Sequence, residues 1–264
     1  MNSENNSVFT TIGWNGEKGI FAFREHLNRL EKHAKIAGIK YDKEVELQIK
    51  KKIKSKKLKK IDKNSQIESC KPHGLITIRL GYDGEVSISE RENEYNLNCE
   101  FIDAITVDVS ESLKKNIGIK IGEHLPYKNA LEIAKNHGGN AALIVENNAI
   151  IDGDRAALMI LDKDGTAWVS SKKYGSIQSI TIDLIKEKLI KRGIPLIFGK
   201  ITTDLILRSN DAIMLGTGLG VTRVRSIDKR IFKFPNSILF DNSISAFNEM
   251  NEEKWMDLNE VENI

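Results

Sequence analysis

The sequence predicts an α+β protein in two parts: β-hairpins with one pair of helices, followed by a region that mixes strands and helices. The dipeptides Asn15-Gly16 and Asp83-Gly84 each separate two strand-like segments, as the turns of β-hairpins do. Apolar residues at helical spacing lie between these hairpins. The later part lacks the regular β-α-β alternation of a doubly wound parallel sheet, which excludes that fold class.

The first hairpin, over residues 7–23, leads into a helix. Leu27 and Leu30 begin the helical spacing of residues 24–39, and Gly38 provides a stop. A second helix is expected over Val45–Leu58. The second hairpin follows over residues 74–91.

The composition becomes polar over residues 93–98, which places a domain boundary near residue 103. We therefore expect a smaller domain over residues 1–103 and a larger one over 104–264. We expect a strand over residues 103–110, where the larger domain begins, and a second strand through Lys120. The remaining expected elements are a helix over 126–139, short strands within 141–171, a helix over 179–194, a strand over 195–202, a short helix over 203–209 and a strand–turn–strand over 211–228.

Composition excludes several functional classes. The net charge of +3 is too small to indicate nucleic-acid binding, and no apolar run approaches the roughly 20 residues that span a bilayer. The polar N-terminus does not resemble a signal peptide. Cys70 and Cys99 fit no metal-binding spacing and indicate a reducing, cytoplasmic setting. The lysine-rich run over residues 50–66 suggests either a nucleic-acid contact or a solvated helix end, and its isolation in a nearly neutral chain favours the latter.

Lys120 is unusual because it lies between Ile119 and Ile121 in an apolar, glycine-flanked segment. Its side chain either reaches water or is held in a cavity for a chemical purpose. Asp152 ends a short apolar strand, where it is either a turn residue or a carboxylate that faces a pocket.

Two segments have the composition of anion-binding sites. The first, Leu215–Val221, places glycines and Thr217 after an apolar strand, where they form either a simple turn or a phosphate site. The second begins the helix near Ser179 and Thr181, which are either N-cap residues or phosphate ligands. A lysine, a carboxylate and two anion-binding turns are together the parts that a pyridoxal-phosphate enzyme needs.

In these segments, and in their order, the sequence resembles the class IV, or fold-type IV, pyridoxal-phosphate enzymes. These include branched-chain and D-amino-acid aminotransferases and aminodeoxychorismate lyase. The similarity runs from about Val8 to Asp228 and includes the H-L-x-R-L pattern of residues 26–30 and the segment "NDAIMLGTGLGVTRVRSID". It implies a two-domain fold, with a small N-terminal α/β sandwich and a larger C-terminal pseudo-barrel domain that binds the cofactor.

The resemblance also implies a role for each site residue. Lys120 is the catalytic lysine that carries the cofactor, and Asp152 takes the place of a glutamate beside the pyridine nitrogen. The phosphate ligands are Arg29, Ile180, Thr181 and Thr217.

Several positions depart from the family pattern. Asp152 is one methylene shorter than glutamate. A serine-rich stretch ending in asparagine is replaced by residues 154–157, which include Ala156 and Ala157. Ser179 and Ile182 replace a glycine and an arginine, and Leu125 occupies the place of a tyrosine, to which nearby Tyr127 is not equivalent.

The resemblance implies an aminotransferase that acts on small amino and 2-keto acids, uses pyridoxal 5'-phosphate and forms a homodimer. Two alternatives remain open. One is a lyase that releases pyruvate from an aminodeoxychorismate-like substrate, and the other is a non-catalytic protein of the same fold. Arg79, on a strand of the first part, either binds a substrate carboxylate or is a surface arginine.

Overall fold

The computed structural model describes residues 7–56, 71–94, 100–114, 118–233 and 237–263. The chain forms two compact units that are interleaved along the sequence. Unit 1 comprises Met1–Asn98, Ile119–His124 and Asn251–Ile264, and unit 2 comprises Cys99–Gly118 and Leu125–Met250. The α+β class expected from the sequence is confirmed, whereas the domain boundary at residue 103 stays a prediction.

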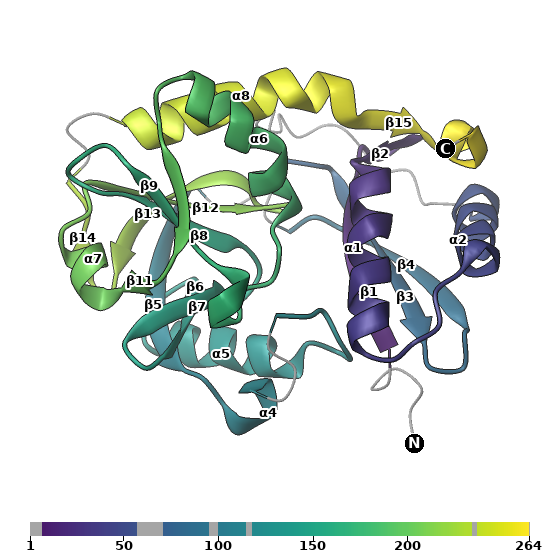
Figure 1. The fold of residues 1–264 in the computed structure, drawn as a ribbon, viewed down its shortest axis with the longest axis horizontal. Helices are drawn as coiled ribbons and strands as arrows, with labels where there is room; N and C mark the ends of the chain where they lie inside the picture. The colour runs from purple at the N-terminus through teal and green to yellow at the C-terminus, as the bar shows by residue number, and fades with distance from the viewer. Residues whose placement is uncertain (1–6, 57–70, 95–99, 115–117, 234–236, 264) are drawn as a thin grey trace. The chain divides into compact units, whose positions relative to one another are not determined.

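Unit 1 is built on an antiparallel sheet in the order β15-β2-β1-β3-β4 (Figure 1). Both hairpins expected from the sequence are confirmed. The side chain of Asn15 accepts the Gly19 N–H in the first turn, and that of Asp83 accepts the Glu85 N–H in the second. The strands are β1 (Ser7–Trp14), β2 (Gly19–Phe21), β3 (Gly74–Gly81), β4 (Val86–Glu92) and β15 (Trp255–Asp257).

Two helices, α1 (Phe23–Ile36) and α2 (Lys43–Ser55), pack on one face of this sheet around a core that includes Val8, Ile12 and Leu30. Helix α2 begins before Val45 because the Asp42 carboxylate caps its first turn. A short helix, η3 (Leu258–Asn263), lies against α2.

The described part of the lysine-rich run serves unit 1 itself. Lys52 and Lys56 donate to main-chain carbonyls of β4, and Lys56 also pairs with Glu90. Residues 57–66, Cys70 and Cys99 lie outside the described residues.

The prediction of a strand through Lys120 is wrong. Only an isolated bridge between Val8 and Ile121 joins this segment to β1. The short β2 pairs with the far end of β1, which leaves the first half of β1 open to the 119–124 segment. Residues 115–117 of the predicted strand lie outside the described residues.

Unit 2 is a sheet that closes on itself. Its order is β10-β9-β8-β12-β13-β5-β6-β7-β11, with β14 paired to β13. The two end strands are separated only by Lys200, and β10 pairs with β9 while β11 pairs with β7. The strand predicted over residues 195–202 is therefore present but divided, and its two halves join opposite ends of the sheet into a barrel-like closure.

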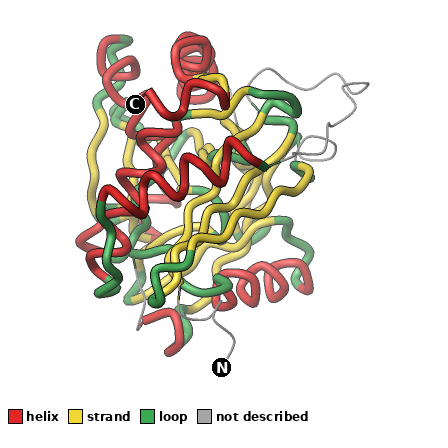
Figure 2. Tube along the Cα trace, turned by 90° about the vertical axis from the view of Figure 1, so that its right-hand side faces the viewer, coloured by secondary structure: helices red, strands yellow, loops and turns green. Residues whose placement is uncertain are grey.

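The strands of unit 2 are β5 (Phe101–Asp108), β6 (Ala141–Glu146), β7 (Ala149–Gly153), β8 (Ala157–Leu161), β9 (Ala167–Ser170), β10 (Leu196–Gly199), β11 (Ile201–Thr202), β12 (Asp211–Gly216), β13 (Gly220–Ile227) and β14 (Arg230–Ile231). They appear as yellow tubes in Figure 2, with the helices in red. The helices are α4 (Glu111–Lys114), α5 (Leu125–Asn136), η2 (Lys172–Tyr174), α6 (Ile180–Lys191), α7 (Thr203–Leu207) and α8 (Ile238–Lys254), the last of which extends beyond Met250 into unit 1. Helix α5 packs on β5 and β6, and α6 on β12 and β10. In the described part of the chain, no helix combines the length and apolar character needed to cross a membrane.

Candidate active site

Lys120 lies in unit 1 with its backbone held from two directions. The Phe9 N–H donates to the Lys120 carbonyl at 3.0 Å, and the Lys120 N–H donates to Nδ1 of His33 at 3.1 Å. The Lys120 ammonium is 5.3 Å from the centre of the Phe9 ring. The Arg79 guanidinium lies 4.8 Å from the same centre, and the His124 ring meets Phe9 edge-on. Lys120 is thus one of three nitrogen-bearing side chains arranged around one aromatic ring.

Arg29 is buried on α1 and belongs to a polar chain in the same unit. It donates to the Thr10 hydroxyl oxygen at 3.0 Å, and that oxygen is 2.8 Å from Nδ1 of His26. The Thr10 hydroxyl therefore links the Arg29 guanidinium to the His26 ring. Burial lowers the pKa of His26, and the charges of Arg29 and Lys120 lower it further. The structure therefore brings these two predicted site residues together around a neutral histidine.

Asp152 lies at the end of β7 in unit 2, and its carboxylate is buried. One oxygen accepts the Gly153 N–H and the other the Ile177 N–H, both at 2.9 Å. Burial raises the pKa of Tyr127, and the Asp152 charge raises it further, which places this tyrosine near the carboxylate. These contacts hold the Asp152 carboxylate at the end of β7 through main-chain amides from two separate segments.

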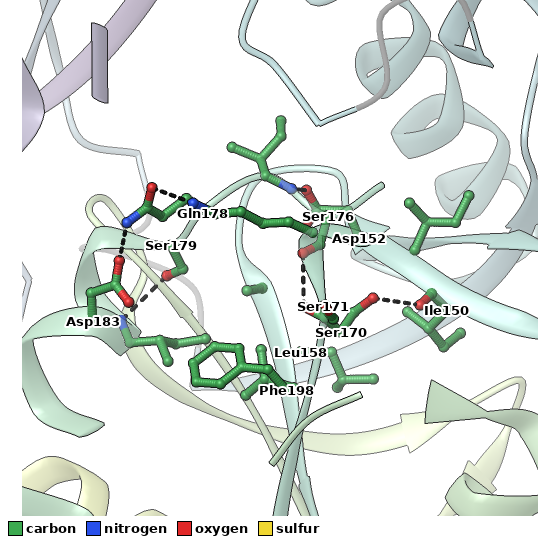
Figure 3. A pocket seen from close by; sticks show the side chains of 16 residues that line it. Ile150, Asp152, Leu158, Ser170, Ser171, Ser176, Gln178, Ser179, Asp183 and Phe198 are labelled. Carbon is green, nitrogen blue, oxygen red and sulfur yellow. Dashed lines mark hydrogen bonds between the residues drawn. The ribbon is translucent and has the colours of Figure 1, made fainter. Parts of the chain in front are cut away.

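Asp152 also lines a cavity of about 290 Å³ within unit 2 (Figure 3). Serine and glutamine side chains form its polar part, where Ser176 donates to the Ser170 carbonyl at 2.7 Å and Gln178 bridges Lys172 and Asp183. The apolar wall consists of Ile150, Ile151, Ala157, Leu158, Val169, Ile177, Ile182 and Phe198. Of the six predicted site residues, only Asp152 lines this cavity.

The first turn of α6 carries two of the other predicted residues. Ser179 is the N-cap residue, and its hydroxyl accepts the Ile182 N–H at 3.3 Å. The N–H groups of Ile180 and Thr181 have no acceptor among the residues that the structure describes. Ser179 thus caps the helix, and the prediction that Ile180 and Thr181 bind an anion stays a prediction.

Thr217 lies in the turn between β12 and β13, directly after Gly216. A side-chain carbon at Gly216 would come within 3.0 Å of Ala156, and one at Gly153 within 2.2 Å of the Ala156 carbonyl. These glycines allow the loop that follows Asp152 to pack against the end of β12. Because α6 also packs on β12, the three predicted segments of unit 2 share this strand.

The departures at residues 154–157 have a structural role. Asp154 is buried, and its carboxylate accepts the Ala142 N–H at 2.8 Å and the Arg155 side-chain N–H at 2.6 Å. Ala156 and Ala157 are also buried. This loop is therefore fixed by an internal ion pair and by close packing.

The predicted site residues thus form two groups, with Arg29 and Lys120 in unit 1 and Asp152, Ile180, Thr181 and Thr217 in unit 2. Sequence reasoning missed Thr10, His26, His33 and the Ile177 amide as their partners. The available signal was the spacing of His26, Arg29 and His33, which places three polar residues on the buried face of α1.

Solved structures share this fold. A branched-chain aminotransferase from Thermoproteus uzoniensis with norvaline is 19% identical with a TM-score of 0.77, over 96% of this chain and 90% of that one. A branched-chain amino acid aminotransferase from Escherichia coli is 18% identical with a TM-score of 0.73, over 97% and 90%. A putative 4-amino-4-deoxychorismate lyase from Legionella pneumophila is 18% identical with a TM-score of 0.72, over 93% and 91%.

No curated protein matches the sequence. The family model described as amino-transferase class IV matches residues 7–227, which is most of the chain. These residues include every predicted site residue and both turns that the sequence predicts to bind an anion. The chain belongs to the class IV aminotransferase family.

Proposed function

We propose that this protein is a pyridoxal-phosphate-dependent enzyme that transfers an amino group between an amino acid and a 2-keto acid, with Lys120 as its reacting lysine. The placement of Lys120 carries the proposal. Its main chain is fixed on both sides, and its amine lies beside Phe9 with Arg29 close enough that both cations act on His26. Another solved branched-chain aminotransferase of this fold, 18% identical to the chain, is described with pyridoxamine 5'-phosphate, which supports the choice of cofactor.

The residues present fit pyridoxal phosphate in kind. Unit 1 offers a primary amine and a buried guanidinium, and unit 2 offers a buried carboxylate and two helix N-terminal amides without acceptors among the described residues. A phosphate suits the guanidinium and the amides. A protonated ring nitrogen suits Asp152, because a carboxylate is a hydrogen-bond acceptor of opposite charge.

Each residue has a defined task. When bound, pyridoxal phosphate supplies a covalent attachment for an amine and withdraws electrons from the adjacent carbon. The Lys120 amine removes the proton from the substrate α-carbon and returns it at the next step. Arg29, Thr181 and Thr217 would hold the phosphate, and Asp152 would accept the ring N–H.

Arg79 binds a carboxylate of the substrate in this proposal. It donates one N–H to the Gly122 carbonyl at 2.7 Å, stacks on Phe9 and forms no ion pair with any described residue. Arg79 and Lys120 both lie within 5.3 Å of one ring centre. That proximity suits a substrate with an amine and a carboxylate, and it disfavours the surface-arginine interpretation.

A lyase that releases pyruvate is the second candidate. The similarity to a putative 4-amino-4-deoxychorismate lyase favours it. It requires the same lysine and the same carboxylate site, so residues alone do not separate the two reactions.

Visible spectra of the wild type and Lys120→Ala, with added pyridoxal phosphate and with borohydride, test the proposal. We expect a band that borohydride fixes on Lys120, detected by peptide mass spectrometry, and that Lys120→Ala lacks. Turnover of glutamate with keto acids supports the transferase, whereas pyruvate release without an amino acceptor supports the lyase. A wild type that binds no added cofactor would refute both and leave a non-catalytic protein of this fold.

We also propose a cytoplasmic homodimer. The dimer follows from the family resemblance, and the compartment from the two isolated cysteines. Light scattering on the purified protein measures the oligomeric state.

A further inference from the structure

The hydrogen bond of the Lys120 amide departs from the pattern that its neighbours set. Phe9 N–H donates to the Lys120 carbonyl, and Gly122 N–H donates to the Ser7 carbonyl, as in an antiparallel ladder. In such a ladder the Lys120 N–H would donate in return to the Phe9 carbonyl. It donates instead to Nδ1 of His33 at 3.1 Å. A side chain of α1 therefore takes a place that β1 would otherwise fill.

This bond determines the state of the imidazole. A backbone N–H can only donate, so Nδ1 of His33 must carry a lone pair and no proton. His33 is 3% exposed, and the Lys120 amide is partly buried, so water competes little for either group. The two residues are 87 positions apart in the chain, and the bond ties α1 to the segment that presents the lysine.

We propose that His33 is a positioning residue for Lys120: its Nδ1 holds the Lys120 amide and so fixes the direction in which the lysine side chain leaves the main chain. The functional value of this contact rests on the proposed role of Lys120, whereas the contact itself does not. His33 follows Arg29 by one helical turn on the buried face of α1. One helix face thereby holds the lysine and carries the guanidinium, which sets the relative position of the two groups.

The test compares His33→Leu with His33→Asn. The Asn side-chain oxygen is as many bonds from the main chain as Nδ1 and accepts the same N–H, whereas leucine fills the space without an acceptor. His137→Leu is the matched control, because His137 is an exposed histidine at the end of α5. The full-length protein is used throughout.

The first readout is hydrogen exchange of the Lys120 amide, followed by NMR without added cofactor. We expect roughly tenfold faster exchange in His33→Leu, since a partly buried N–H loses its acceptor. His33→Asn should restore exchange to within about threefold of the wild type, and His137→Leu should not change it. Unchanged exchange in His33→Leu, or no rescue by His33→Asn, would overturn the proposal.

The second readout is the dissociation constant of pyridoxal phosphate from the visible band, with the pH at which the band changes. A displaced lysine should weaken binding roughly tenfold and shift that pH in His33→Leu, with rescue in His33→Asn. Equal constants and equal pH profiles in the three proteins would overturn the positioning role. If the wild type shows no band, the proposed function fails, while the exchange experiment still decides whether His33 holds Lys120.

Discussion

Replacing Thr10 with valine should show how much the buried hydrogen bonds between Arg29, Thr10 and His26 contribute to the free energy of unfolding. Thr10 is fully buried, and its hydroxyl accepts from Arg29 and is hydrogen-bonded to Nδ1 of His26. Valine keeps the shape and removes the hydroxyl. The Arg29 guanidinium loses a charge-assisted hydrogen bond, which contributes about 1.5–3 kcal/mol to stability. His26 loses a neutral hydrogen bond, which contributes about 1 kcal/mol. We expect Thr10→Val to lower the free energy of unfolding by about 3 kcal/mol.

Urea unfolding followed by circular dichroism measures this change, and two controls isolate it. Thr10→Ser keeps the hydroxyl and loses one methyl group, which should cost about 1 kcal/mol. Thr11→Val makes the same replacement at the next strand position, where the hydroxyl meets Thr77 at 3.3 Å in a partly buried site. It should cost less than about 1 kcal/mol. A Thr10→Val protein that unfolds within about 0.5 kcal/mol of Thr10→Ser would refute the hydrogen-bonded chain.

Three further predictions concern unit 2. Burial raises the pKa of Asp211 to about 6 from 3.8. Between these two pH values the folded state binds a proton at Asp211 that the unfolded state has lost. The free energy of unfolding therefore falls as pH rises through that window, by up to about 3 kcal/mol. Asp211→Asn should therefore flatten the difference between urea unfolding at about pH 4 and about pH 7, and an unchanged slope would contradict this. Gly153→Ala should cost about 3 kcal/mol or more in the same assay, because its new carbon would lie 2.2 Å from a main-chain carbonyl; stability within about 1 kcal/mol of the wild type would show that the loop relaxes. Asp152→Leu should lose binding of pyridoxal phosphate by equilibrium dialysis, and Asp162→Leu, at an Asp whose carboxylate also caps main-chain amides, is its control.

Local features of the sequence predicted much of unit 1. The Asn15-Gly16 and Asp83-Gly84 turns fix both hairpins because their side chains and positive φ angles complete the turns within a few residues. Helix α1 ends just before Gly38, which adopts φ 71°. Such elements depend on near neighbours in the chain, so the pattern of residues contains them.

The features that the sequence did not predict depend on contacts between residues far apart in the chain. The closure of unit 2 requires one strand to divide at Lys200 and join β9 with one half and β7 with the other. Helix α8 carried no prediction, and its buried face includes the polar Ser243 between Leu239 and Ala246, which weakens the apolar pattern. Neither feature follows from local spacing.

The candidate site divides along the same line. The kinds of side chain were predictable, since an amine, a guanidinium and a carboxylate define the chemistry that a phosphate-bearing cofactor requires. The contacts that fix these side chains in place were not predictable, because each joins a side chain to a main-chain amide far away in the sequence. His33 accepts the Lys120 N–H, and Asp152 accepts the Ile177 N–H. Every buried polar group needs a partner, so polar residues on a predicted buried face indicate that such a contact exists without naming it. On α1, His33 stood on that face, and only the fold showed that its partner was the amide of the lysine to which we assign the reaction.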